Sequence, residues 1–263
     1  MKRIASVLFL ALVCVTARAQ FFDCCSGLLN TPSAEMEEDG TFMITNNYLN
    51  RNNVPNKTRW YTGTFSYGFD ITFLERVEIT YICTLVKGRK DKRGYWPEST
   101  WGKFCNQDRH FSAKFLLMKE NQFWKWMPSV AVGICDPVTG GNRTDYIGSD
   151  VSSGNGFFNR MYAVATKHFN TSWGQLGTTV GYQYNLRKDC HYNAPCAALT
   201  WDPKWLNNPD WFLSGARMVA EYDARTFNIG LIASVWRKHF EGMVELQNCR
   251  HISAGIRYRL LIK

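Results

Sequence analysis

The sequence predicts an all-β protein, a closed antiparallel up-and-down transmembrane β-barrel of about twelve strands. Short segments that alternate between apolar and polar residues fill the chain after position 20, and no stretch keeps a helical periodicity. Aromatic residues make up 15% of the chain, and many stand near the ends of these segments. No apolar run after position 20 reaches the roughly 20 residues of a membrane-spanning helix. Because only helices and closed barrels satisfy every backbone polar group in lipid, a membrane protein with this pattern must be a barrel.

Residues 1–19 have the features of a secretory signal peptide. Lys2 and Arg3 form a basic start, Ile4 to Val15 an apolar centre, and Ala17-Arg18-Ala19 a cleavage site. The apolar centre is too short for a transmembrane helix. We therefore expect this segment to be removed on export.

The rest of the chain divides into a short N-terminal segment and one barrel domain, without an internal repeat. We expect residues 20–39 to form a periplasmic or plug-like segment and residues 40–263 to form the barrel. Alternation is clearest in the last four strands, as where Phe227 and Ile229 alternate with Asn228. A membrane strand needs about 9–11 residues, and the segments expected to be strands are 40–48, 59–69, 75–86, 108–118, 127–135, 158–169, 176–185, 194–201, 216–223, 227–235, 240–247 and 251–262.

A soluble β-sandwich also alternates, but it buries its apolar face in a core. Aromatic residues at segment ends favour the membrane barrel, because interfacial girdles occupy those positions. These residues are Trp60, Tyr61, Trp96, Trp124, Trp126, Trp201, Trp205, Trp211 and Trp236.

The last expected strand carries an assembly signal. Its residues Ser253, Gly255, Tyr258 and Leu260 follow the order polar, any, Gly, any, any, aromatic, any, hydrophobic. This order resembles the signal that the barrel-assembly machinery recognises in its substrates. We therefore expect the outer membrane of a Gram-negative bacterium as the location, with this machinery, outer-membrane lipid and lipopolysaccharide as partners.

Charged residues fall on strand faces that we expect to line the lumen. One interpretation is a charged channel that guides a polar or anionic saccharide. The other is a network of ion pairs that fills the barrel, since buried charges must be paired. Side chains fill barrels of about 8 strands, whereas 16–18 strands leave a channel, so both interpretations stay open and we favour the filled barrel. The candidates are Arg76, Glu78, Lys114, Arg217, Glu221, Asp223, Glu241, Glu245, Arg257 and Arg259.

The sequence contains no motif that predicts catalysis or metal binding. Glu221 with Asp223, or Glu241 with Glu245, could form the carboxylate pair of a glycosidase, but such i, i+2 pairs are common in any polar lumen. G-x-S-x-G and H-E-x-x-H motifs are missing. The acidic run Glu35 to Asp39 lacks the ligand spacing of a calcium loop, and we expect a solvated turn there. The predictions are no enzymatic activity, no cofactor and no metal.

The formal net charge of the chain is +9, spread along the sequence. In an exported protein this basic balance favours anionic polysaccharide or lipopolysaccharide over nucleic acid as a partner.

The chain has nine cysteines, of which Cys14 lies in the expected signal peptide. The even number that remains permits disulfides in an oxidising compartment. Sequence does not fix their connectivity, and the candidate pair is Cys190 with Cys196, which flank a short loop containing Pro195.

The start of the mature chain resembles a known family. Gly27-Leu28-Leu29-Asn30-Thr31-Pro32-Ser33-Ala34, followed by Asp39-Gly40-Thr41, resembles the opening motif of the YjbH-like exopolysaccharide-biosynthesis outer-membrane β-barrel family, in a short single-barrel form of Bacteroides type. The motif positions are Gly27, Asn30, Pro32, Asp39 and Gly40. Further matches are Ala165-Thr166-Lys167-His168-Phe169, Glu221-Tyr222-Asp223, Phe227-Asn228-Ile229-Gly230 and Gly255-Ile256-Arg257-Tyr258.

The resemblance implies an outer-membrane accessory barrel in the export or assembly of extracellular or capsular polysaccharide, working with polysaccharide-export proteins. The enterobacterial members are longer and are lipoproteins. This chain departs from them in two ways, because it is short and lacks a convincing lipobox. Three alternatives remain from the residues themselves: a porin-like diffusion channel, an envelope enzyme embedded in the barrel, and a secreted soluble β-sandwich.

Overall fold

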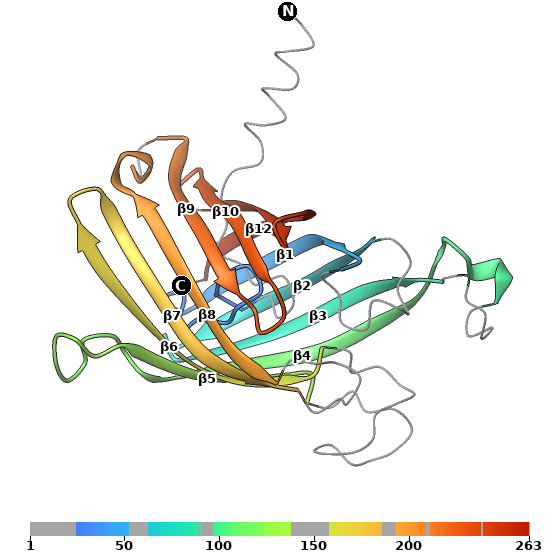
Figure 1. Ribbon diagram of the computed structural model, residues 1–263, viewed down its shortest axis with the longest axis horizontal. Coiled ribbons are helices and arrows are strands. Elements are labelled where there is room, and N and C mark those ends of the chain that lie inside the picture. The colour runs from blue at the N-terminus through green and yellow to red at the C-terminus, as the bar shows by residue number, and fades with distance from the viewer. Residues whose placement is uncertain are drawn as a thin grey trace, which may run out of the picture.

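A computed structural model describes residues 25–52, 63–88, 90, 97–137, 158–185, 193–208, 211–237 and 239–262 of the protein. In these residues twelve antiparallel strands form a closed barrel (Figure 1). Each strand pairs with its neighbours in the chain, and the last strand pairs with the first. The predicted all-β closed barrel of about twelve strands is therefore confirmed.

Within the described ranges, no helix is long and apolar enough to cross a membrane.

The strands follow the expected segments, with a few shifted boundaries. The fourth strand begins at Phe104 rather than at residue 108, and the eighth continues to Pro203. The strands are β1 (Thr41–Asn50), β2 (Gly63–Phe73), β3 (Val77–Lys87), β4 (Phe104–Met118), β5 (Ser129–Cys135), β6 (Arg160–Thr171), β7 (Gly174–Tyr184), β8 (Ala194–Pro203), β9 (Leu213–Tyr222), β10 (Phe227–Val235), β11 (Phe240–Gln247) and β12 (His251–Leu261), with short 3-10 helices η1 (Glu98–Thr100) and η2 (Lys204–Leu206) in the connections.

The barrel closes where β1 pairs with β12, from Thr41 opposite Leu261 to Tyr48 opposite Ala254. The motif residue Gly40 lies just before this seam in the left-handed region, with φ of +75°. A Cβ atom at this position would lie 2.5 Å from the carbonyl oxygen of Ile262, so the seam requires glycine here. Closure leaves none of the twelve described strands with an edge open to pairing with another chain.

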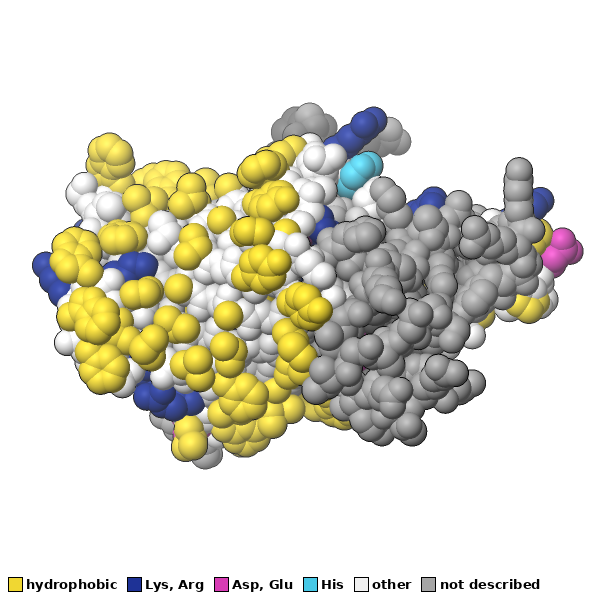
Figure 2. Space-filling model, turned by 60° about the horizontal axis from the view of Figure 1, so that its bottom comes forward, with side chains coloured by type: hydrophobic (Ala, Val, Ile, Leu, Met, Phe, Trp, Pro, Cys, Tyr) yellow, Lys and Arg dark blue, Asp and Glu magenta, His cyan; other side chains and the backbone are white. Residues whose placement is uncertain are grey.

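The outer face of the barrel is apolar and the inner face is polar. On β12, Ile252 and Ile256 are 52% and 65% exposed. Ser253 and Arg257, which directly follow them in the strand, are buried. Hydrophobic side chains cover much of the described outer wall in the view of Figure 2. A soluble β-barrel has the reverse arrangement, because it buries its apolar face.

Among the described residues, the exposed tryptophans gather at one rim of the barrel. This rim, which we call the terminal rim, carries the start of β1, the end of β12 and the turns that connect β2 to β3, β4 to β5, β6 to β7, β8 to β9 and β10 to β11. We call the opposite end the loop rim. Tryptophan at a rim is typical of a membrane–water interface, and the exposed residues in the terminal-rim connections are Trp124, Trp126, Trp173, Trp205, Trp211 and Trp236.

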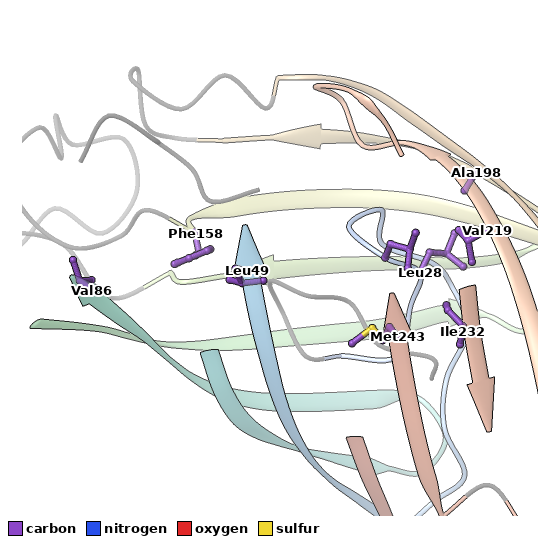
Figure 3. Close-up of a cluster of buried hydrophobic side chains, with 9 residues drawn as sticks. Leu28, Leu49, Val86, Phe158, Ala198, Val219, Ile232 and Met243 are labelled. Atoms are coloured by element: carbon purple, nitrogen blue, oxygen red, sulfur yellow. The ribbon is translucent and has the colours of Figure 1, made fainter. Parts of the chain in front are cut away.

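The N-terminal segment of the chain lies inside the barrel. All residues from Cys25 to Ala34 are buried, and we call residues 25–35 the plug segment. Two of its leucines pack against side chains that point inward from strands around the barrel (Figure 3). The structure thus places part of the segment expected at 20–39 in the lumen, while residues 1–24, including the expected signal peptide, lie outside the described residues. This lumen cluster consists of Leu28, Leu29, Leu49, Val86, Phe158, Ala198, Val219, Ile232 and Met243.

The outer face predicts how a charge on it should behave. Ile256→Lys should lower the free energy of unfolding in lipid vesicles by about 2–4 kcal/mol, because the charge would enter hydrocarbon near the middle of a strand. Leu74→Lys is the matched control, since Leu74 is 73% exposed but lies at the terminal rim, where the cost should be about 0–1 kcal/mol. Urea unfolding followed by tryptophan fluorescence measures both values. Equal destabilisation by the two substitutions would contradict a lipid-facing wall.

Candidate functional site

The plug segment turns back on itself as a tight hairpin. Gly27 and Pro32 form an antiparallel bridge, and the Leu28 amide donates a hydrogen bond of 3.3 Å to the carbonyl oxygen of Thr31. Glycine, asparagine and proline favour turns, so the local sequence specifies this hairpin. The hairpin coincides with the motif on which the family resemblance rests.

The carboxylate of Glu221 on β9 binds the tip of the hairpin. It accepts hydrogen bonds from the backbone amides of Leu29, Asn30 and Thr31 at 3.2, 2.7 and 3.1 Å. The side-chain amide of Asn228 donates a fourth, at 3.2 Å. Consecutive amides that converge on one anion form a concave binding site, and hydrogen bonds to an ionised group are the stronger kind. Glu221 therefore holds the tip in one position.

The motif residue Asn30 joins three strands of the wall. Its side-chain amide donates to Glu245 on β11, and its backbone oxygen accepts from the Arg160 guanidinium on β6 at 3.2 Å. The same Arg160 nitrogen is 2.7 Å from the side-chain oxygen of Gln183 on β7. Asn30 is fully buried, so every one of these bonds replaces one that water would have made.

The base of the hairpin is held by a buried ion pair. Lys114 on β4 lies 2.9 Å from Glu78 on β3, and both side chains are inaccessible to solvent. Ser26 donates its amide and its hydroxyl to the Glu78 carboxylate, while the Lys114 ammonium donates to the backbone oxygens of Ser26 and Glu35. A buried pair is tolerated only when further hydrogen bonds satisfy both ions, and here the plug segment supplies them.

The plug segment ends at Glu35, whose carboxylate meets two cationic or titratable groups. Arg217 on β9 donates from Nη1 to both oxygens of Glu35 at 2.8 and 2.9 Å. Its Nε and Nη2 atoms donate to the carboxylate of Asp202 on β8. His168 on β6 lies 3.2 Å from Glu35 through Nε2. The expectation of a solvated turn is therefore wrong for Glu35, whose side chain is 8% exposed, and for Glu37, which pairs with Arg259 at 2.7 Å.

Most of the candidate lumen residues point inward. Arg257 is buried and donates to the backbone oxygen of Cys25 at 3.3 Å, and Arg259 bridges Glu37 and Glu241. The structure brings eight candidates together around or below the plug segment, namely Glu78, Lys114, Arg217, Glu221, Glu241, Glu245, Arg257 and Arg259.

Two candidates lie in turns instead. Arg76 is half-buried in the β2–β3 turn and donates to the carbonyl oxygen of Leu116. Asp223 follows β9 and caps the β9–β10 turn, accepting from the amides of Arg225 and Thr226 at 3.0 and 2.9 Å. Neighbouring positions in the sequence, Glu221 and Asp223, therefore have unrelated roles.

The sequence analysis missed several partners of the plug segment. Arg160 lies on the inward face of β6. The alternation of inward and outward residues along that strand could have identified it. Asp202 and the hydroxyl of Thr166, which accepts from the Ala34 amide at 2.9 Å, follow only from the closed barrel, because their partners are distant in the chain.

The remaining predicted positions lie as follows. Asp39 accepts from the amide of Leu74 at the terminal rim. In the assembly signal, Ser253 accepts from the amide of Asn50 at 3.0 Å, and Tyr258 packs outward against Phe240. For the candidate disulfide, Cys190 lies outside the described residues and Cys196 is buried, so this bridge stays a prediction.

A polar cavity of about 860 Å³ opens at the terminal rim below the plug segment. Side chains of both charges line it, among them Glu37, Asp202, Lys204, Arg217, Arg237 and Arg259.

The geometry defines a class of protein, a closed twelve-stranded barrel that holds its own N-terminal hairpin in the lumen through buried charged groups. The chain belongs to the YjbH family, because residues 24–194 match the family described as exopolysaccharide biosynthesis protein YbjH. The predicted resemblance is thus confirmed. The matched range includes the hairpin and its partners on β3, β4 and β6, while Glu221 and Glu245 lie beyond it. No curated protein matches the chain.

The bonds to Glu221 predict how firmly the tip is held. Glu221→Ala should speed hydrogen exchange of the amides of residues 29–31 by about 10- to 100-fold, since bonds to a charged group contribute about 1.5–3 kcal/mol. Mass-spectrometric exchange on the refolded barrel measures this. The control is Glu75→Ala, which removes an exposed ion pair with Lys119 at the rim and should leave the three amides unchanged. Unchanged exchange in Glu221→Ala would refute the role of this carboxylate.

The Asp223 cap predicts a pH dependence. Burial would raise the pKa of Asp223, but the Arg225 guanidinium and the amides of Arg225 and Thr226 outweigh it and hold the pKa below its ordinary value. A carboxyl group with a lowered pKa stabilises the fold above its unfolded pKa of about 3.9, and this contribution is lost as pH falls through the folded pKa. Asp223→Asn should therefore lower the free energy of unfolding by about 1–2 kcal/mol at neutral pH. In urea unfolding at a series of pH values, the difference from wild type should shrink below about pH 4, and a constant difference would contradict the assignment.

Proposed function

We propose that the protein is an outer-membrane accessory barrel in the export or assembly of extracellular polysaccharide, with a lumen that its plug segment keeps closed. Two findings support this proposal, namely the barrel fold and the membership of an exopolysaccharide-biosynthesis family. The observation that carries the finer proposal is the buried hairpin, fixed at its tip by Glu221 and at its base by Glu78 and Lys114.

The outer-membrane location is supported by the surface of the barrel. Its wall is apolar, and the exposed tryptophans at the terminal rim match an interfacial girdle. In barrels of this type short turns face the periplasm and longer loops face outward. We infer that the terminal rim faces the periplasm, where the polar cavity would meet export proteins or the polysaccharide. A signal peptide at residues 1–19 would direct the chain there.

A scaffold or gated role is favoured over an open diffusion channel because the hairpin occupies the space that a porin leaves to water. A glycosidase role is disfavoured by the placement of the carboxylates. Glycosidases need two carboxyl groups that flank a sugar, yet Glu221 is engaged by three amides of the plug segment and Asp223 by a turn.

The closed lumen is tested by conductance in planar bilayers. The wild-type barrel should insert without stable conductance, whereas a double variant, Glu78→Ala with Glu221→Ala, should conduct, because the plug segment loses one anchoring carboxylate at its base and one at its tip. Glu75→Ala serves as the control and should stay silent. Steady conductance of the wild-type barrel would support a diffusion channel and contradict the proposal.

The role in polysaccharide production needs a cellular test. Cells without the gene should carry less surface polysaccharide, and wild-type protein or Glu75→Ala should restore it. Normal polysaccharide in cells that lack the gene, across conditions in which the gene is expressed, would refute the accessory role.

A further inference from the structure

Three side chains with metal-binding atoms meet in the lumen near the loop rim, apart from the charged groups described above. Asp108 and His110 lie on β4, and Asp136 directly follows β5. One ligand atom from each residue lies within 4.8 Å of the other two. All three residues are buried, with exposed fractions of 0%, 2% and 2%.

The two strands hold this cluster rigidly. Asp108 and His110 share the inward face of β4, because side chains two residues apart point the same way. The His110 ring stacks on Phe158, with ring centroids 5.1 Å apart, and Phe158 belongs to the lumen cluster around Leu28. Buried side chains on two paired strands are a preorganised arrangement.

Asp136 reaches the cluster through an unusual backbone conformation. Strict alternation along β5, in which Ser129, Ala131 and Cys135 point inward, would send residue 136 outward. Its φ of +49° reverses this direction. The turn is fixed by its amide, which donates to the Phe111 oxygen at 2.8 Å, and by its carbonyl oxygen, which accepts from the Asn159 side chain at 2.9 Å. The chain thus brings a second buried carboxylate next to the first.

A divalent cation between two buried carboxylates and an imidazole would be stabilised by both carboxylate charges. One imidazole nitrogen and two carboxylate oxygens suit a divalent transition-metal ion. We propose that Asp108, His110 and Asp136 bind Zn²⁺, which would tie β4 to the end of β5 at the loop rim.

A second cluster in the lumen has a different composition. Cys25, Asp70 and Glu78 also lie within 4.8 Å of one another. There the Lys114 ammonium lies 2.9 Å from Glu78, and Thr80 donates to Asp70 at 2.8 Å. In that cluster Glu78 already binds Ser26 and Lys114 at the base of the plug segment. The Asp108 cluster, by contrast, contains an imidazole, a group that transition metals prefer.

The test is Zn²⁺ titration of the full chain, refolded in detergent and stripped of metal with EDTA, followed by calorimetry. We expect one Zn²⁺ per chain and a rise in melting temperature on binding. Asp136→Asn and His110→Gln should each weaken binding by at least about tenfold and abolish that rise. Asparagine tolerates the left-handed conformation, so Asp136→Asn removes the charge and keeps the turn, which circular dichroism would verify.

Two controls separate this site from adventitious binding. His239→Gln changes a histidine at the opposite rim, next to Trp236, and Cys105→Ser changes an exposed thiol. Both should bind Zn²⁺ like wild type. The proposal is overturned if Zn²⁺ does not bind saturably, or if an adventitious ion only is found, that is, binding that survives both cluster substitutions or disappears with either control.

Discussion

Charged side chains that point into a narrow lumen need partners inside the protein, because a buried charge without one costs several kcal/mol. For Glu221, the described residues place such partners on the plug segment as well as on the wall. Glu221 has no cation at hydrogen-bond distance in the bonds described above; its partners are backbone amides of the hairpin and the side chain of Asn228. The hairpin is therefore part of the folded barrel rather than an appendage, since the wall and the plug segment satisfy each other's polar groups.

The plug segment is attached at two levels of the lumen. Near the terminal rim the Glu78–Lys114 pair binds its base, and nearer the loop rim Glu221, Glu245 and Arg160 bind its tip. Between them Leu28 and Leu29 fill the apolar part of the lumen. Because the contacts at the two levels differ in chemistry, a change in the solution or in a partner protein could weaken one level and leave the other.

The sequence predicted the barrel well because strand alternation is a local property. Residues 251–262 alternate between outward-facing and lumen-facing side chains almost without exception, and the observed β12 follows them. The contacts inside the lumen could not be predicted from the sequence, because residues such as Ser26 and Glu78 meet only once the barrel has closed. The inward position of Asp136 was also not predicted, for a different reason. Alternation assigns it to the outer face, and only its local φ of +49° turns it inward. Glu35 was misplaced because an acidic run beside a strand usually faces water, whereas here Arg217 lies opposite.

The link between the hairpin and the wall has a kinetic consequence. Residues 36–40 connect the plug segment directly to β1, and Gly40 fixes the seam at which that strand begins. A hairpin that left the lumen would remain tethered within a few residues of the mouth, at an effective concentration in the millimolar range for a short flexible connection. Return would then be a first-order event, independent of how many copies the cell makes. A ligand competing for the vacated space would have to outbind a competitor that never diffuses away.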